Sequence, residues 1–198
     1  MIELDADLPA ELAPLSWLIG FWEGSGVVDY KIGEQSRGLE FGQRISFSHD
    51  GLPHLNYTSY TWLLDGSNTP HVTETGYWRL RRPHLDGDPG PGMLPGIGPR
   101  PYSTADEVEA LRMPDGTFEI EVTIVHPTGV NEFYIGRAAG PRIDLSTDAV
   151  MRTASAKEYS AATRLYGLVE NHLLWAWDIA ALGQDLRTHA SGRLARVQ

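Results

Sequence analysis

Residues 117–137, TFEIEVTIVHPTGVNEFYIGR, carry the pattern that decides the fold class. Apolar and polar side chains alternate from Thr117 to Val125, the turn sequence Pro127-Thr128-Gly129 follows, and a second β-branched and aromatic run extends from Val130 to Arg137. A period of two between turn residues is typical of strands and not of a helix. These residues therefore predict two strands joined by a short turn.

Segments of the same kind recur along most of the chain. Turn residues such as Asp50-Gly51 and Asp65-Gly66 separate them. Only residues 8–19 suggest a short helix. Short strands at regular spacing favour an up-and-down antiparallel barrel or a sandwich, and closure into a barrel removes exposed sheet edges. The pattern predicts about ten strands, within residues 18–30, 39–49, 55–64, 72–80, 107–111, 117–125, 130–137, 142–146, 161–168, 172–179 and 188–196.

Residues 82–104 interrupt this pattern with closely spaced prolines and glycines. Such a composition predicts an irregular loop. The strands on either side of it are too few to form two complete cores. We therefore expect residues 1–198 to form one β-barrel domain with a Pro/Gly-rich insertion at about 82–104.

The composition narrows the classes of partner. The chain has 198 residues, a net charge of −10 and no cysteine. An acidic chain is not expected to bind nucleic acid or an anionic membrane surface, and the lack of cysteine excludes disulfides and thiol chemistry. The acidic N-terminus lacks the basic start and apolar run of a signal peptide, and no apolar run approaches the roughly 20 residues of a membrane span. We expect a cytoplasmic protein, and a homodimer is left open.

Common catalytic motifs have little support. The seven histidines contain neither a His-x-His pair nor the i, i+4 spacing of a zinc protease. No Gly-x-Ser-x-Gly nucleophile elbow and no phosphate-binding loop occurs in the required context. Any one histidine is more simply a surface or hydrogen-bonded residue than a ligand.

The segment Gly20-Phe21-Trp22-Glu23-Gly24-Ser25-Gly26 needs a physical explanation of its own. Glycines weaken a strand unless another part of the backbone must approach it closely. Trp22 is large and needs burial. We expect a bend at the start of a barrel, with Trp22 filling the end of the core.

This segment also resembles the Gly-x-Trp-x-Gly-x-Gly motif of the nitrobindins. The resemblance covers nearly the whole chain except the 82–104 loop, and the order and spacing of the matching stretches agree. These stretches lie at residues 12–20, 47–53, 74–77, 126–132, 156–158 and 183–189.

The resemblance implies a ten-stranded antiparallel barrel, similar to the fatty-acid-binding proteins, that holds ferric haem b. His189 falls on the proximal histidine of the family, which is the axial ligand of the iron. Lys157 falls on a residue that contacts the haem, and Tyr30-Lys31-Ile32 lies where a family loop touches the porphyrin, which makes Ile32 a candidate haem contact. The implied activity is isomerisation of peroxynitrite to nitrate, together with nitric oxide binding.

The chain departs from the family pattern at two places. Lys31-Ile32 replaces a Pro-Thr pair, so a hydroxyl contact to the haem is lost. Val72 stands where some members have a distal histidine, and His71 lies one residue earlier. Because neighbouring strand residues point to opposite faces, this offset predicts an apolar distal pocket without a distal histidine ligand. The 82–104 loop follows the same strand and is expected to cover or flank the haem.

Two other functions remain open from the sequence. The first is a haem or nitric oxide sensor or carrier without turnover. The second is a barrel that binds an apolar ligand and no haem, as its fold relatives do. A Soret band after reconstitution with haem distinguishes the haem-binding functions from an apolar-ligand barrel that binds no haem.

Overall fold

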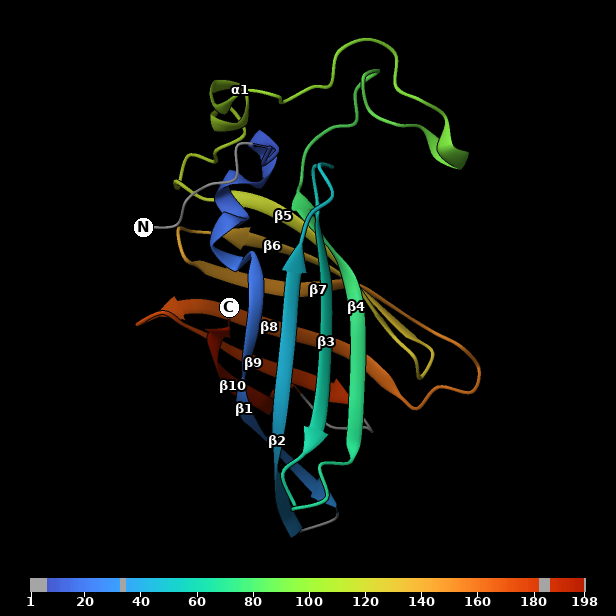
Figure 1. Cartoon of the computed structure of the whole chain (residues 1–198). Coiled ribbons are helices and arrows are strands. Elements are labelled where there is room, and N and C mark those ends of the chain that lie inside the picture. The colour runs from blue at the N-terminus through green and yellow to red at the C-terminus, as the bar shows by residue number, and fades with distance from the viewer. Residues whose placement is uncertain (1–6, 33–34, 182–185, 198) are drawn as a thin grey trace.

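The strands close into a single antiparallel barrel in the computed structural model, which describes residues 7–32, 35–181 and 186–197 (Figure 1). Each strand pairs with its neighbours in the chain, and β1 pairs with β10 to close the barrel. The prediction of a ten-stranded up-and-down barrel is therefore confirmed. The strands are β1 (Gly20–Ile32), β2 (Gln35–Ser48), β3 (Leu55–Leu63), β4 (Pro70–Leu80), β5 (Phe118–His126), β6 (Val130–Ala138), β7 (Arg142–Arg152), β8 (Tyr159–Val169), β9 (His172–Ala181) and β10 (Arg187–Val197).

The glycines of β1 allow the closing strands to approach each other. Gly24 pairs with Leu194 and Gly26 pairs with Gly192. A Cβ atom at Gly24 would overlap the backbone carbonyl of Arg193, and one at Gly26 would overlap the Phe41 ring. The motif is thus explained by packing at the seam of the barrel.

A 3₁₀ helix, η1 (Ala10–Leu18), covers one end of the barrel (Figure 1). Trp22 is fully buried beneath it, and its Nε1–H donates to the Leu18 carbonyl at 2.7 Å. Arg196 lies over the Trp22 ring at 4.3 Å and donates to the Trp17 carbonyl at 2.8 Å. The expected role of Trp22 as the plug of the core is confirmed. Apolar burial against η1 makes this the closed end.

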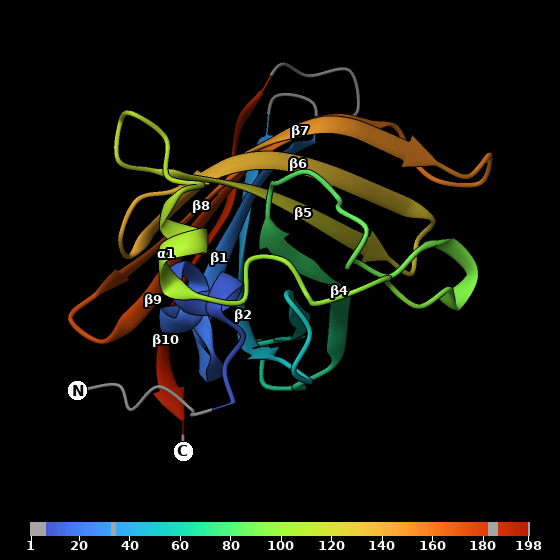
Figure 2. The same cartoon turned by 90° about the horizontal axis from the view of Figure 1, so that it is seen from above.

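The Pro/Gly-rich loop is tied to the closed end (Figure 2). Its first residues hold Arg82, which is buried and donates to Glu11 of η1 at 2.8 Å and to Asp88 at 2.5 Å. The pKa of Asp88 is lowered to about 2, chiefly by this hydrogen bond from Arg82. The loop contains a short 3₁₀ turn, η2 (Pro91–Met93).

The prediction of a strand at residues 107–111 is wrong. It overlaps a short helix, α1 (Ala105–Glu109). Thr104 caps this helix by accepting a hydrogen bond from the Glu107 backbone, and the Glu107 side chain accepts one from the Thr104 backbone at 3.0 Å. This capping box satisfies backbone donors that a strand would have to pair elsewhere.

Candidate functional site

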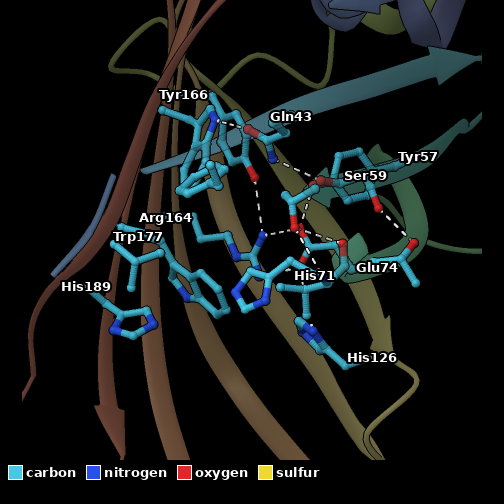
Figure 3. Close-up of a pocket in the computed structure, with 17 residues that line it drawn as sticks. Gln43, Tyr57, Ser59, His71, Glu74, His126, Arg164, Tyr166, Trp177 and His189 are labelled. Atoms are coloured by element: carbon cyan, nitrogen blue, oxygen red, sulfur yellow. Dashed lines mark hydrogen bonds and ion pairs between the residues drawn. The ribbon is translucent and has the colours of Figure 1, made fainter. Parts of the chain in front are cut away.

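A pocket opens inside the barrel at the end away from η1 (Figure 3). Its enclosed part has a volume of about 130 Å³ and continues into space that is open to solvent. Its walls combine apolar and polar side chains: Val28, Phe41, Gln43, Tyr57, Ser59, Thr61, His71, Val72, Thr73, Glu74, His126, Arg164, Tyr166, Trp175, Trp177, His189 and Ala190.

His189 reaches this pocket because β10 contains a β-bulge. Thr188 pairs with Asp178 and Ala190 pairs with Trp177, so His189 is an extra residue between two consecutive pairs. A bulge breaks the strict alternation of faces. As a result, the neighbouring residues His189 and Ala190 both line the pocket.

The imidazole of His189 is suited to metal ligation. Burial, and then the positive charge of Arg187, lower its pKa below the ordinary value of 6.5. It is therefore neutral at pH 7, with a ring nitrogen free to act as a ligand. The Trp177 ring meets it edge to face, with 5.7 Å between ring centroids and an interplanar angle of 87°.

A second bulge lies in β4, at His71 and Val72. Tyr60 pairs with Thr73 and Trp62 pairs with Pro70, which leaves one extra residue in β4. The Thr61 hydroxyl donates to the Val72 carbonyl and accepts from the Val72 backbone N–H, each at 3.0 Å. Both His71 and Val72 consequently line the pocket. The expectation that the offset turns His71 to the other face is wrong, because it assumed regular alternation of faces. The absence of a distal histidine ligand stays a prediction.

Four side chains from different strands form a buried charged cluster in the wall. Arg164 of β8 binds both carboxylate oxygens of Glu74, at 2.7 and 3.0 Å, and one oxygen of Glu132 at 3.1 Å. His126 Nε2 lies 2.7 Å from the other carboxylate, that of Glu132. We call Arg164, Glu74, Glu132 and His126 the Arg164 cluster. Three tyrosine hydroxyls also donate to its carboxylates, from Tyr57, Tyr134 and Tyr159.

The Arg164 cluster keeps its carboxylates ionised. Burial alone would raise the pKa of Glu132, but Arg164 and the hydrogen bonds outweigh it and lower that pKa to about 2. The pKa of Glu74 is lowered by the same balance of burial against Arg164. The Arg164 guanidinium is only 3% exposed, and its pKa is raised because the carboxylate charges overcome its desolvation. Its donors are thus directed at the two carboxylates and at the hydroxyls of Tyr134 and Tyr166.

Trp177 connects the cluster to His189. The guanidinium of Arg164 lies over its ring at 4.2 Å, and the His126 ring stacks on it at 6.1 Å with an interplanar angle of 13°. Its buried Nε1–H has no hydrogen-bond partner among the described residues. The charged cluster and the imidazole of His189 therefore contact the same indole ring.

Three side chains form a hydrogen-bonded row across the inner part of the pocket. Trp175 Nε1–H donates to Gln43 Oε1 at 2.8 Å, and Gln43 Nε2–H donates to Ser59 Oγ at 2.9 Å. Gln43 is 4% exposed and Ser59 is 3% exposed. We call Trp175, Gln43 and Ser59 the Gln43 row.

The other residues singled out from the sequence lie elsewhere. Lys157 is exposed in the turn between β7 and β8, and it is not among the residues that line the pocket. Ile32 ends β1, but its side chain is outside the part of the chain that the structure describes. The prediction that the 82–104 loop covers or flanks the pocket is wrong, because the loop is held at the closed end by Arg82 and contributes no lining residue.

Sequence reasoning missed the Arg164 cluster and the Gln43 row. Their residues stand at inward positions of strands, where apolar side chains are the norm. Arg164 lies between the inward-facing Ala162 and Tyr166 of β8. An isolated charge at an inward position was the available signal, and only the neighbouring strands show its partners. In the parts of the chain that the structure describes, no helix has the length and apolar character needed to cross a membrane.

Comparisons with known proteins agree with this geometry. Residues 11–196 match the family model described as "THAP4-like, heme-binding beta-barrel domain". A protein of Leifsonia xyli subsp. xyli named "Peroxynitrite isomerase" is 69% identical over the full length of both chains, and one of Kocuria rhizophila with the same name is 50% identical over 100% of this chain and 96% of its own. The "Crystal Structure of Rv2717c from M. tuberculosis" superposes with a TM-score of 0.68 at 26% identity, covering 96% of this chain and 99% of that one.

Proposed function

We propose that this chain, which belongs to the THAP4-like, heme-binding β-barrel domain family, holds ferric haem b in its pocket and isomerises peroxynitrite to nitrate. The observation that carries the proposal is the neutral imidazole of His189, directed into an open pocket by the β10 bulge. We further propose that the chain acts as one cytoplasmic domain in which the 82–104 insertion belongs to the closed end.

The residues present fit a haem. His189 supplies one imidazole nitrogen, and the aromatic and aliphatic walls Phe41, Val72, Trp177 and Ala190 suit a flat apolar macrocycle. We propose that Lys157 pairs with a haem propionate, since it lies two residues from Tyr159, whose ring contacts Trp177. Ile32 is retained as a proposed apolar contact.

Bound in this pocket, ferric haem would supply a Lewis-acidic iron that can take a small anion or nitric oxide. The chain's own residues act around it. Trp177 fixes the orientation of the His189 ring, and the apolar walls would keep water away from the faces of the haem that they cover. The Arg164 cluster braces Trp177, because the Arg164 guanidinium lies over the ring while His189 meets the ring edge to face.

The test is the decay of peroxynitrite and the yield of nitrate with the haem-loaded protein, with the His189→Ala variant loaded in the same way, and with equimolar free haem. We expect faster decay and more nitrate with the wild type than with either control. Equal decay in the wild type and the variant would contradict the isomerase proposal. Haem binding without nitrate formation above free haem would instead indicate a sensor or carrier.

The pH dependence of haem binding is a separate prediction. A proton competes with iron for the imidazole, so affinity falls as pH drops through the pKa of His189 in the folded protein. Since burial places that pKa below 6.5, haem affinity should be constant from pH 8 to 6.5 and fall by about tenfold per pH unit only at lower pH. Optical titration with haem at a series of pH values measures this. A decline that starts above pH 6.5 would contradict the assigned ligand state.

The Arg164 cluster also bears on the alternative of an apolar ligand without haem. A fatty acid would require a free cation for its carboxylate. Within the described lining, the arginine is already bound to Glu74 and Glu132. The pocket therefore offers a carboxylate ligand no unpaired buried guanidinium.

A further inference from the structure

The direction of hydrogen bonding in the Gln43 row is fixed by chemistry. An indole Nε1–H is a donor only. Gln43 must therefore turn its carbonyl oxygen to Trp175 and its amide nitrogen to Ser59, as the distances of 2.8 and 2.9 Å show. Ser59 Oγ is then an acceptor in this row.

The proton of the Ser59 hydroxyl is left without an acceptor. Among the described residues, Ser59 Oγ takes part in no hydrogen bond in which it donates. The side chain is 3% exposed and lines the pocket. Buried hydroxyl groups rarely lack a partner, because the loss of hydration is then uncompensated. The free donor therefore points to an acceptor that occupies the pocket.

Among the described residues, the neighbouring polar groups do not accept this proton, and their own donors are directed elsewhere. The nearby Thr61 hydroxyl donates to the Val72 carbonyl, and that of Thr73 donates to the Ser59 carbonyl at 2.8 Å. The donors of Arg164 are directed at the carboxylates of Glu74 and Glu132 and at tyrosine hydroxyls. Ser59 is thus a buried donor of the inner pocket whose partner must come from outside the described chain.

We propose that Ser59, oriented by Gln43 and Trp175, donates a hydrogen bond to an acceptor oxygen of a small anion bound in the pocket. Ser59 touches the bound anion, while Gln43 and Trp175 are positioning residues. The row gives the pocket a preference for oxygen-bearing anions over ligands that lack an acceptor at this point. The inference deepens the proposed function, since peroxynitrite is such an anion, and rests on it.

The test compares two ligands of the haem-loaded ferric protein by optical titration. Nitrite has acceptor oxygens, whereas imidazole bound through one nitrogen presents only N–H and C–H groups. For Ser59→Ala we expect nitrite to bind about tenfold more weakly, as loss of one hydrogen bond to a charged group predicts, and imidazole to bind as in the wild type. Ser59→Thr, which keeps the hydroxyl, should retain nitrite affinity. Gln43→Leu should weaken nitrite binding as well, because it frees the Ser59 hydroxyl to turn.

The outcomes separate this inference from the proposed function. Equal nitrite affinity in the wild type and Ser59→Ala, with haem bound in both, would overturn the role of Ser59 and leave haem binding intact. An equal loss of nitrite and imidazole affinity would also overturn it, since that indicates a general disturbance of the pocket. If the wild type takes up no haem, the proposed function fails. The Ser59 donor is then tested by titrating the haem-free protein with nitrite and recording NMR spectra. The signals of the Gln43 side-chain amide and the Trp175 indole N–H should shift in the wild type but not in Ser59→Ala. Equal shifts in the two proteins, or none, would overturn the inference.

Discussion

Replacing Arg164 by Leu is expected to lower the free energy of unfolding by about 3–5 kcal/mol at pH 7.5, because it removes the guanidinium held between two buried carboxylates. Glu132 is fully buried and Glu74 nearly so. Their charges would then face burial without a guanidinium. Urea denaturation of the two proteins measures the change.

The loss should shrink as the pH falls. In the wild type the pKa values of both glutamates are lowered, so their contribution to stability is present above the ordinary value of 4.5 and is lost as pH falls toward the folded value, about 2 for Glu132. Without Arg164, burial raises these pKa values, and the carboxylates can take up protons in the folded state at mildly acidic pH. The difference between variant and wild type at pH 5 should therefore be smaller than at pH 7.5.

A matched control is available on the barrel surface. Arg142 pairs with Asp144, and both side chains are more than half exposed. Arg142→Leu should have little effect on stability, since exposed ion pairs contribute little. A loss for Arg164→Leu no greater than that of Arg142→Leu would contradict the role assigned to the Arg164 cluster.

Replacing His189 by Ala is expected to lower haem affinity by more than about 100-fold. Mutation of a residue that only hydrogen-bonds to a metal ligand typically lowers affinity by about 10–100-fold, and loss of the ligand itself should lower it further. The physical reason is loss of the one neutral imidazole that the β10 bulge turns into the pocket beside Trp177. The rate of haem transfer to an excess of a haem-accepting protein measures the effect. His172→Ala on the neighbouring strand β9 serves as control, because His172 contacts Glu170 and Arg193 and does not line the pocket. Equal haem loss from the two variants would contradict the assignment.

The barrel itself could be predicted from the sequence. Alternation along β5 and β6, with a Pro-Thr-Gly turn between them, is a local property that survives in the structure. The burial of Trp22 was predictable for a similar reason, since a large indole in a glycine-rich strand needs both space and cover. Local patterns determine these features, and the structure confirms them.

The pocket was harder to predict from the sequence, because it depends on departures from the local pattern. The two bulges place His71 beside Val72 and His189 beside Ala190 on one face, which a period of two cannot anticipate. The Arg164 cluster draws its members from β4, β5, β6 and β8, and each charge alone would suggest solvent exposure. Family resemblance predicted His189 as a site residue, whereas only the assembled barrel shows what surrounds it.

The central claim is that His189 is the protein ligand of the haem iron, and imidazole rescue tests it most directly. The measurement is the optical spectrum of ferric haem bound to His189→Gly, recorded before and after addition of free imidazole. We expect the variant alone to lack the spectrum of the haem-loaded wild type, and we expect imidazole to restore it by occupying the vacated space. A variant that shows the wild-type spectrum without imidazole would contradict the claim.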